Sequence, residues 1–476
     1  MKNINKTLLA AAISLGMLAG CNSDNDSKAA DPMVRFATFN LSFDRTAAGM
    51  LTGELALTRT EQDALLARLA EGSLSGATET KAKNVQQIRN VAEIIQRTRP
   101  DVFLLNEFDN DGKGESTADL KAFNDNYLAH AQHAEVTAIS YPVMQHFATN
   151  TGLMSGYDLN LDGKVNSGPD DAWGFGNYHG QYAFAVMSKY PIDTKQIRTF
   201  QNFKWKDMPG EQNPIIDDCN NPKVKIPASR QCGDAWYSDA AWQQYPLSSK
   251  NHADVPVRIK TEKGEEVIHF LISHPTPPIF ANAARHTVKH NRAEIAFWND
   301  YVKGLNYMTD DKGTKGGLAK NAKFVIAGDL NADPLTGDGD LTAIQDLLNN
   351  PLMNQAITNG TLIPVSEGGP ECVSKGADCK RNLTRPNPER ITNSSVLQLD
   401  HVIPPPTSTR SRAASSGRPA SRPVITWSMM RNSASPKGSA RITAWCGSIS
   451  NSTNSAMTPL RRGLLLARGG ALTTVH

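Results

Sequence analysis

The chain has 476 residues, of which 39% are hydrophobic and 20% charged, as is typical of a globular protein with one large or two ordinary domains. Its formal charge of +3 is unevenly distributed: residues 402–476 contain nine Arg and one Lys but no Asp or Glu. The first 401 residues, with 40 basic and 47 acidic side chains, therefore carry a net charge of −7. Duplex-DNA binders usually carry a basic excess, so the acidic body argues against a dedicated non-specific DNA binder, although a local basic patch remains compatible with it.

The N-terminus is typical of a targeting segment. Lys2 and Lys6 supply positive charge, residues 8–18 are apolar, and Leu-Ala-Gly-Cys at 18–21 matches a bacterial lipobox. We expect residues 1–20 to be a lipoprotein signal peptide, Cys21 to carry a diacylglyceryl group and residues 21–32 to form a tether. The alternative is an ordinary secretory signal with no role for Cys21. No second apolar run reaches the ~20 residues of a membrane span, so we expect a lipid-anchored protein of the bacterial cell envelope, in the outer membrane and facing the periplasm or the outside.

Strands and helices alternate along the next part of the chain. Strands are predicted at 34–41, 102–106, 182–187, 267–273, 323–328 and 397–402, and helices at 83–97, 285–303 and near 341–349. Residues 46–80 form an inserted helical region, and residues 109–180 and 200–250 are long and loop-rich. This order favours the α/β class.

Two polar stretches, Asn-Glu-Phe-Asp at 106–109 and Gly-Asp-Leu-Asn at 328–331, each end an apolar run. Such runs predict buried strands, and open α/β sheets bind ligands at the carboxyl ends of their strands. Carboxylates and an amide gathered there could hold a hard divalent cation, aim a water molecule and bind a phosphate.

The composition changes abruptly after Pro404. Residues 404–476 are rich in Ser, Arg, Pro and Ala, lack acidic side chains and show no sustained apolar period. Because roughly a tenth of residues are normally acidic, we favour a slip of reading frame near Pro404 over a disordered basic tail. Residues 33–404 are then the expected catalytic domain, and 405–476 a low-complexity tail.

Six elements occur in a characteristic order, namely Thr-Phe-Asn-Leu at 38–41, Arg-Pro-Asp-Val to Asn-Glu over 99–107, Met-Ser-Lys-Tyr-Pro-Ile at 187–192, Ser-His-Pro at 273–275, Gly-Asp-Leu-Asn at 328–331 and Leu-Asp-His-Val at 399–402. This order resembles the endonuclease/exonuclease/phosphatase superfamily, the fold of pancreatic deoxyribonuclease, over residues 34–404. The resemblance implies a four-layer α/β sandwich, with two packed β-sheets flanked by helices. It also implies hydrolysis of a phosphate ester with Mg²⁺ or Mn²⁺.

The resemblance assigns a role to each site residue. Glu107 would be the main metal ligand, with Asn40 beside it. Asp329 would orient or deprotonate the attacking water, and Asn331 and His274 would donate to the phosphate. The remaining catalytic candidate, Asp400, matches the Asp that positions a final catalytic His. The residues alone leave alternatives open. Glu107 and Asp329 could be caps at strand ends, and Asn40 could be a turn residue. His274 could be a histidine of a structured loop, and Asp400 could form a surface ion pair.

One departure affects the expected activity. The family ends with Ser-Asp-His on its last strand, whereas the only His beyond His401 is His476, with no Asp before it. We expect the written chain to lack a core strand and to be impaired. Two enzymatic hypotheses, a nuclease or phosphodiesterase and a phosphomonoesterase, therefore stand beside a catalytically impaired binding protein. The expected partners are a phosphate-ester substrate (nucleotide, nucleic acid or small phosphoester) and the membrane through the lipid anchor only, with no protein partner.

Two further features concern structural stabilisation. Oxygen-bearing side chains recur over residues 158–166 with Gly163 at the sixth position, as in a structural Ca²⁺ loop, although Pro169 stands where the closing Glu would be. The alternative is a plain Asx-rich turn. The candidate ligands are Asp158, Asn160, Asp162, Lys164 and Asn166. In an oxidising compartment, two cysteine pairs are disulfide candidates rather than free thiols. They are Cys219 with Cys232 and Cys372 with Cys379.

Overall fold

The fold is described from a computed structural model, which describes residues 33–360, 362–366, 368–375, 386–393, 395–406 and 444–449. Two five-stranded mixed sheets pack face to face, with strand orders β10-β1-β2-β4-β3 and β5-β6-β7-β8-β9. The strands are β1 (Val34–Phe43), β2 (Val102–Phe108), β3 (Val143–His146), β4 (Phe184–Ser188), β5 (Arg198–Thr199), β6 (His252–Thr261), β7 (Gly264–Ser273), β8 (Lys323–Asp329), β9 (Asp400–Ile403) and β10 (Ala444–Ile449).

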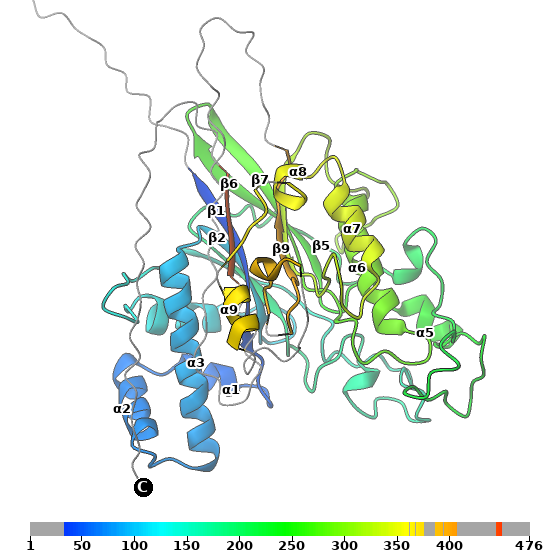
Figure 1. Ribbon diagram of the computed structural model, residues 1–476, viewed down its shortest axis with the longest axis horizontal. Coiled ribbons are helices and arrows are strands. Elements are labelled where there is room, and N and C mark those ends of the chain that lie inside the picture. Colours follow the sequence, from blue (N-terminus) through cyan, green and yellow to red (C-terminus); the bar gives the residue numbers. More distant parts are fainter. Residues whose placement is uncertain are drawn as a thin grey trace, which may run out of the picture.

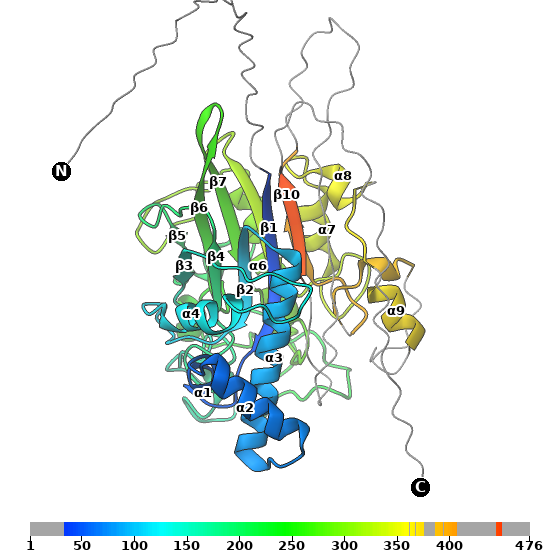
Figure 2. The same ribbon diagram turned by 90° about the vertical axis from the view of Figure 1, so that its left-hand side faces the viewer.

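Helices cover the outer faces of both sheets, as Figures 1 and 2 show. The α-helices are α1 (Met50–Leu55), α2 (Arg59–Ala70), α3 (Gly76–Thr98), α4 (Ala118–Phe123), α5 (Asp239–Gln244), α6 (His286–Tyr301), α7 (Leu341–Asn349), α8 (Gln355–Thr358) and α9 (Gly368–Lys375). Short 3₁₀ or π segments occur at Asn124–Leu128, Pro169–Asp171, Trp205–Asp207 and Pro388–Arg390. The predicted four-layer sandwich is confirmed. None of the helices in the described ranges is long and apolar enough to cross a membrane.

Three apolar layers hold the sandwich together. Between the sheets, alternate side chains of β1, β2 and β4 face those of β6, β7 and β8. The ring centroids of Phe36 and Phe270 lie 5.3 Å apart in this layer. Outside the first sheet, α3 buries Val85, Ile88 and Ile95 at helical spacing. Outside the second sheet, α6 and α7 cover a larger core rich in aromatic side chains. The packing of the two sheets against each other brings the ends of β1, β2 and β8 to one edge of the sandwich.

Four strands were not predicted from the sequence: the short β3 and β5, and also β6 and β10. Strand β6 was not predicted, because Pro256 interrupts it. The Pro256 carbonyl accepts from the Asp193 backbone N–H, so the residue turns its backbone polar atoms away from β7, toward the side where β5 spans only two residues. Strand β10, in the tail expected to lack regular structure, pairs antiparallel with β1 (Figure 2). The expectation that this sheet lacks its last strand is therefore wrong, although Ala-Trp-Cys-Gly-Ser-Ile at 444–449 contains neither Asp nor His.

Candidate active site

One side-chain amide joins the two polar stretches found in the sequence. Asn40 lies on β1, Glu107 near the end of β2, and Asp329 at the end of β8. The Nδ2 atom of Asn40 donates to Oε1 of Glu107 at 2.8 Å and to Oδ2 of Asp329 at 3.0 Å. Asn40 and Asp329 are fully buried, and Glu107 is partly exposed. Residues from both sheets therefore converge on one small polar site.

The backbone around this site is strained. Glu107 has a φ of +56°, and Asn331, Ser42 and Tyr182 also have positive φ values of 50–60°. The register between β1 and β2 shifts between Asn40 and Phe43, which is the signature of a β-bulge. Such conformations cost about 1–3 kcal/mol each in non-glycine residues and persist where the surroundings impose them, often at functional sites. Here the irregular backbone re-aims Glu107 at the end of its strand.

His274 and Asn331 lie on either side of Asp329. The Nε2 atom of His274 is 3.8 Å from Oδ2 of Asp329, and both side chains are almost completely buried. The Asn331 backbone N–H donates to Oδ1 of Asp329 at 3.1 Å, and its side-chain amide donates to the Pro275 carbonyl at 3.0 Å. The loops that follow β7 and β8 are thus tied together where they carry the predicted phosphate-binding side chains.

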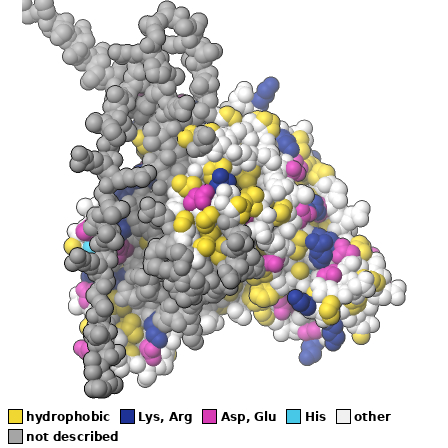
Figure 3. Space-filling model, in the orientation of Figure 1, with side chains coloured by type: hydrophobic (Ala, Val, Ile, Leu, Met, Phe, Trp, Pro, Cys, Tyr) yellow, Lys and Arg dark blue, Asp and Glu magenta, His cyan; other side chains and the backbone are white. Residues whose placement is uncertain are grey.

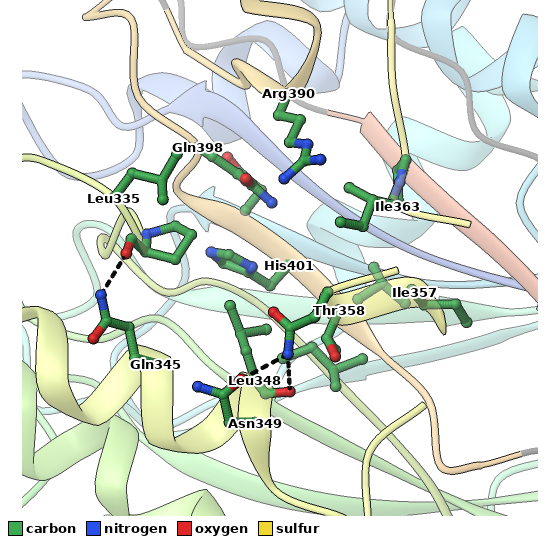
Figure 4. A pocket seen from close by; sticks show the side chains of 16 residues that line it. Leu335, Gln345, Leu348, Asn349, Ile357, Thr358, Ile363, Arg390, Gln398 and His401 are labelled. Carbon is green, nitrogen blue, oxygen red and sulfur yellow. Dashed lines mark hydrogen bonds between the residues drawn. The ribbon is translucent and has the colours of Figure 1, made fainter. Parts of the chain in front are cut away.

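Asp400 and His401 occupy a different position. Asp400 pairs in register with Asp329, and its Oδ2 accepts from the Thr392 hydroxyl at 3.1 Å. His401 is buried, which lowers the pKa of its ring, and its Nε2 lies 3.0 Å from the Ala332 carbonyl. Both residues line a cavity of about 250 Å³ beside β9. Figure 4 shows the His401 ring among the lining side chains, with Arg390 turned toward it. The His401 ring therefore contacts the loop that follows β8.

Asp109, which ends the stretch at 106–109 and received no role of its own from the sequence, organises the neighbouring loops. Its carboxylate accepts from the backbone N–H groups of Arg45 and Tyr182, both at 2.9 Å, and from the Tyr178 hydroxyl. Burial raises the pKa of Asp109 to about 7 in spite of these hydrogen bonds. The available signal was its place at the end of the Asn-Glu-Phe-Asp stretch, two residues after Glu107. The ring of His179 packs against the backbone of Gly112.

The site suits a hard cation that keeps part of its water shell. Glu107 and Asp329 hydrogen-bond to one amide nitrogen, so their carboxylates are close enough for a single hydrated ion to contact both. Mg²⁺ binds through one or two carboxylates and retains several waters. No three His, Cys, Asp or Glu side chains in the described part of the chain gather into a closed protein cage for a metal. In this arrangement the amide nitrogen of Asn40 faces Glu107, so Asn40 orients the carboxylate.

The predicted Ca²⁺ loop uses its oxygens internally. Asp158 accepts from the backbone of Asp162 at 3.1 Å and of Gly163 at 2.9 Å, Asn160 accepts from Asp162 at 2.9 Å, and Asp162 accepts from Lys164 at 2.8 Å. The last candidate ligand, Asn166, accepts from the backbone of Gly156 at 3.1 Å. The sequence missed the buried Asp171, which accepts from the backbone of Leu159 and Ser167. Ca²⁺ binding stays a prediction.

Of the cysteine candidates, Cys219 and Cys232 form a disulfide. Cys21 and Cys379 lie outside the described residues, as does the side chain of Cys372.

A model of the endonuclease/exonuclease/phosphatase family matches residues 37–439. No curated protein matches the chain. Among solved structures, the chain is similar to an endonuclease/exonuclease/phosphatase from Beutenbergia cavernae (13% identity, 89% of this chain and 72% of that one, TM-score 0.39). It is also similar to the catalytic domain of human Nocturnin (11%, 88% and 93%, TM-score 0.35) and to sphingomyelinase C from Streptomyces griseocarneus (14%, 88% and 96%, TM-score 0.32). Since the family match covers most of the chain, including all the site residues, the chain belongs to the endonuclease/exonuclease/phosphatase family.

Proposed function

We propose that this protein hydrolyses a phosphate ester with the help of a divalent cation, Mg²⁺ or Mn²⁺. The observation that carries the proposal is the Asn40 amide, which holds Glu107 and Asp329 at one point although they lie on different sheets. A bound cation supplies charge neutralisation and lowers the pKa of water. Phosphoryl transfer depends mainly on such positioning and charge stabilisation.

The side chains divide the remaining work. Glu107 would hold the cation, since its carboxylate is partly exposed at the strand end. Asp329, buried beside His274, would orient the attacking water and accept its proton. His274 and Asn331 would donate hydrogen bonds to the phosphate oxygens, where negative charge develops. Asp400 would support this group from the neighbouring strand.

The charge of the protein favours some classes of substrate over others. The body carries a net charge of −7 over its first 401 residues. On the face shown in Figure 3, Lys and Arg are interspersed with Asp and Glu where side chains are described, without a broad basic field. We favour substrates other than duplex DNA: single nucleotides, unpaired strands or small phosphodiesters, with phosphomonoesters as the competing class.

A second candidate function is binding without turnover. Its specific support is strand β10, which lies beside β1 but has no Asp or His in its sequence. If the reading frame slips near Pro404, an intact relative would carry Ser-Asp-His in another frame. The nucleotide sequence should be read in all three frames. Ser-Asp-His in another frame would support the enzyme, whereas its absence would support a protein that binds without turnover.

Activity should be assayed with bis-p-nitrophenyl phosphate, p-nitrophenyl phosphate and plasmid DNA, each with Mg²⁺, with Mn²⁺ and with EDTA. We expect cation-dependent turnover that falls by at least ~100-fold in Asp329→Asn, because removing a group that acts on the attacking water costs about this much. Asp346→Asn, an exposed change on α7, is the matched control and should keep full activity. Turnover unaffected by EDTA, or equal in the two variants, would overturn the proposal.

We also propose the lipid anchor at Cys21 and a location in the cell envelope. Metabolic labelling with palmitate should mark the wild-type chain and not Cys21→Ser. Labelling of both or of neither would contradict the assignment.

A further inference from the structure

Helix α6 presents two buried polar side chains to the loops that carry the proposed phosphate-binding residues. Asn291 and Glu294 are both 0% exposed. They are three residues apart, so they lie on the same face of the helix. Neither belongs to the site proposed above, and a buried polar side chain requires partners that offset its loss of solvation. Their partners show what this face of the helix does.

Asn291 bridges the two loops. Its Nδ2 atom donates to the Thr276 carbonyl at 2.8 Å and to the Leu330 carbonyl at 3.0 Å. Thr276 lies two residues after His274, and Leu330 lies between Asp329 and Asn331. One amide therefore fixes the distance between the loop after β7 and the loop after β8.

Glu294 holds the first of these loops from its other side. Its Oε2 accepts from the Thr276 backbone N–H at 2.6 Å, and its Oε1 accepts from the backbone and hydroxyl of Ser249 at 2.8 and 3.0 Å. No ion pair of Glu294 with a Lys or Arg is found in the described part of the chain. A buried carboxylate is costly, so these charge-assisted bonds must offset its desolvation. Both backbone polar groups of Thr276 are thus held by α6.

We propose that Asn291 and Glu294 are positioning residues, which set His274 and Asn331 at their working distances from Asp329. The inference rests on the proposed hydrolysis. Binding groups must be held within a fraction of an ångström to stabilise a transition state. Loosening this contact should therefore reduce turnover more than substrate affinity.

Gln96 on α3 offers a matched control. Its Nε2 atom donates to two backbone carbonyls, those of Leu128 at 2.9 Å and His130 at 2.7 Å, and the side chain is 2% exposed. Asn291→Ala and Gln96→Ala remove the same kind of buried bridge, one beside the proposed site and one outside the other sheet. Glu294→Gln is a second, nearly isosteric variant that keeps the volume but turns an NH₂ group toward an N–H donor.

The experiment measures kcat and KM on bis-p-nitrophenyl phosphate, thermal stability, and the ¹³C-labelled His274 ring signal by NMR, assigned with His274→Gln. We expect Asn291→Ala and Glu294→Gln to lower kcat at least tenfold, to change KM less than threefold and to shift the His274 signal. Gln96→Ala should lower Tm to a similar extent with kcat and the signal unchanged. If the wild type turns over no ester, the NMR signal alone decides: a shift only in the α6 variants supports positioning although the proposed hydrolysis fails. An unshifted His274 signal in both α6 variants, or an equal shift in Gln96→Ala, overturns it.

Discussion

The buried imidazole of His146 should make the fold sensitive to acid. His146 ends β3, is 1% exposed and packs against Phe108, with ring centroids 5.5 Å apart. Burial lowers its pKa from 6.5 to about 4. Between these values the unfolded chain binds one more proton than the folded chain, so stability rises with pH across this window and is lost as pH falls.

The size of this effect follows from the two pKa values. Proton linkage predicts that His146 costs the fold about 2 kcal/mol at pH 5 relative to pH 8, where the ring is neutral in both states. His146→Leu removes the titration while keeping a side chain of similar volume. Other buried histidines, such as His252 and His286, titrate in both proteins and cancel from the comparison.

The assay is urea-induced unfolding of wild type and His146→Leu at pH 8 and pH 5. We expect the stability difference between the two proteins to move by about 2 kcal/mol in favour of the variant on going to pH 5. His133→Gln, at a ring that is about half exposed, serves as the control and should leave the pH dependence unchanged. A difference between wild type and His146→Leu that is the same at both pH values would refute the reasoning.

Two further predictions concern stability at neutral pH. Glu54→Ala should lower the free energy of unfolding in urea by about 3–5 kcal/mol, because it leaves the Arg45 guanidinium buried without the carboxylate that lies 2.6 Å away. The control is Glu79→Ala, at an exposed helical ion pair, which should cost under ~1 kcal/mol. Equal losses in the two variants would contradict this prediction. Gly152→Ala should lower the free energy of unfolding by about 2–4 kcal/mol, because φ is +70° there and the new Cβ would meet a backbone oxygen at 1.9 Å. Gly163→Ala has a similar φ of +87° but open space around the new Cβ, so it should cost only about 1–2 kcal/mol. Differential scanning calorimetry that ranks Gly163→Ala as the more damaging change would be inconsistent with this packing.

Much of the fold could be predicted because its signals are local. The apolar spacing of α3 and the apolar runs of β2 and β8 depend only on residues near one another in the chain. Strand β6 could not be predicted from local signals. Proline has no backbone N–H to donate, so Pro256 is compatible with a strand only where no neighbouring strand needs that donor, and only the order of strands in the sheet decides this. Strand β10 could not be predicted from them either, because its place is set by pairing with β1 rather than by its own composition.

The site divides along the same line. Glu107 and Asp329 could be named from the sequence because each follows an apolar run at a predicted strand end, and Asn40 could be named from the motif Thr-Phe-Asn-Leu that carries the family resemblance. The roles of Asp109, Asn291 and Glu294 could not be predicted, because nothing near them in the sequence says which loop they hold.

The sequence by itself determined most of the central strands and the long helices α3, α6 and α7, and it placed Glu107 and Asp329 at strand ends, because these features depend on side-chain periods of two and 3.6 residues. Only the tertiary structure decided that Asn40 meets Asp329, 289 residues away. That contact exists because two sheets bury their inner faces against each other, and the free energy of that burial comes from side chains spread over the whole chain.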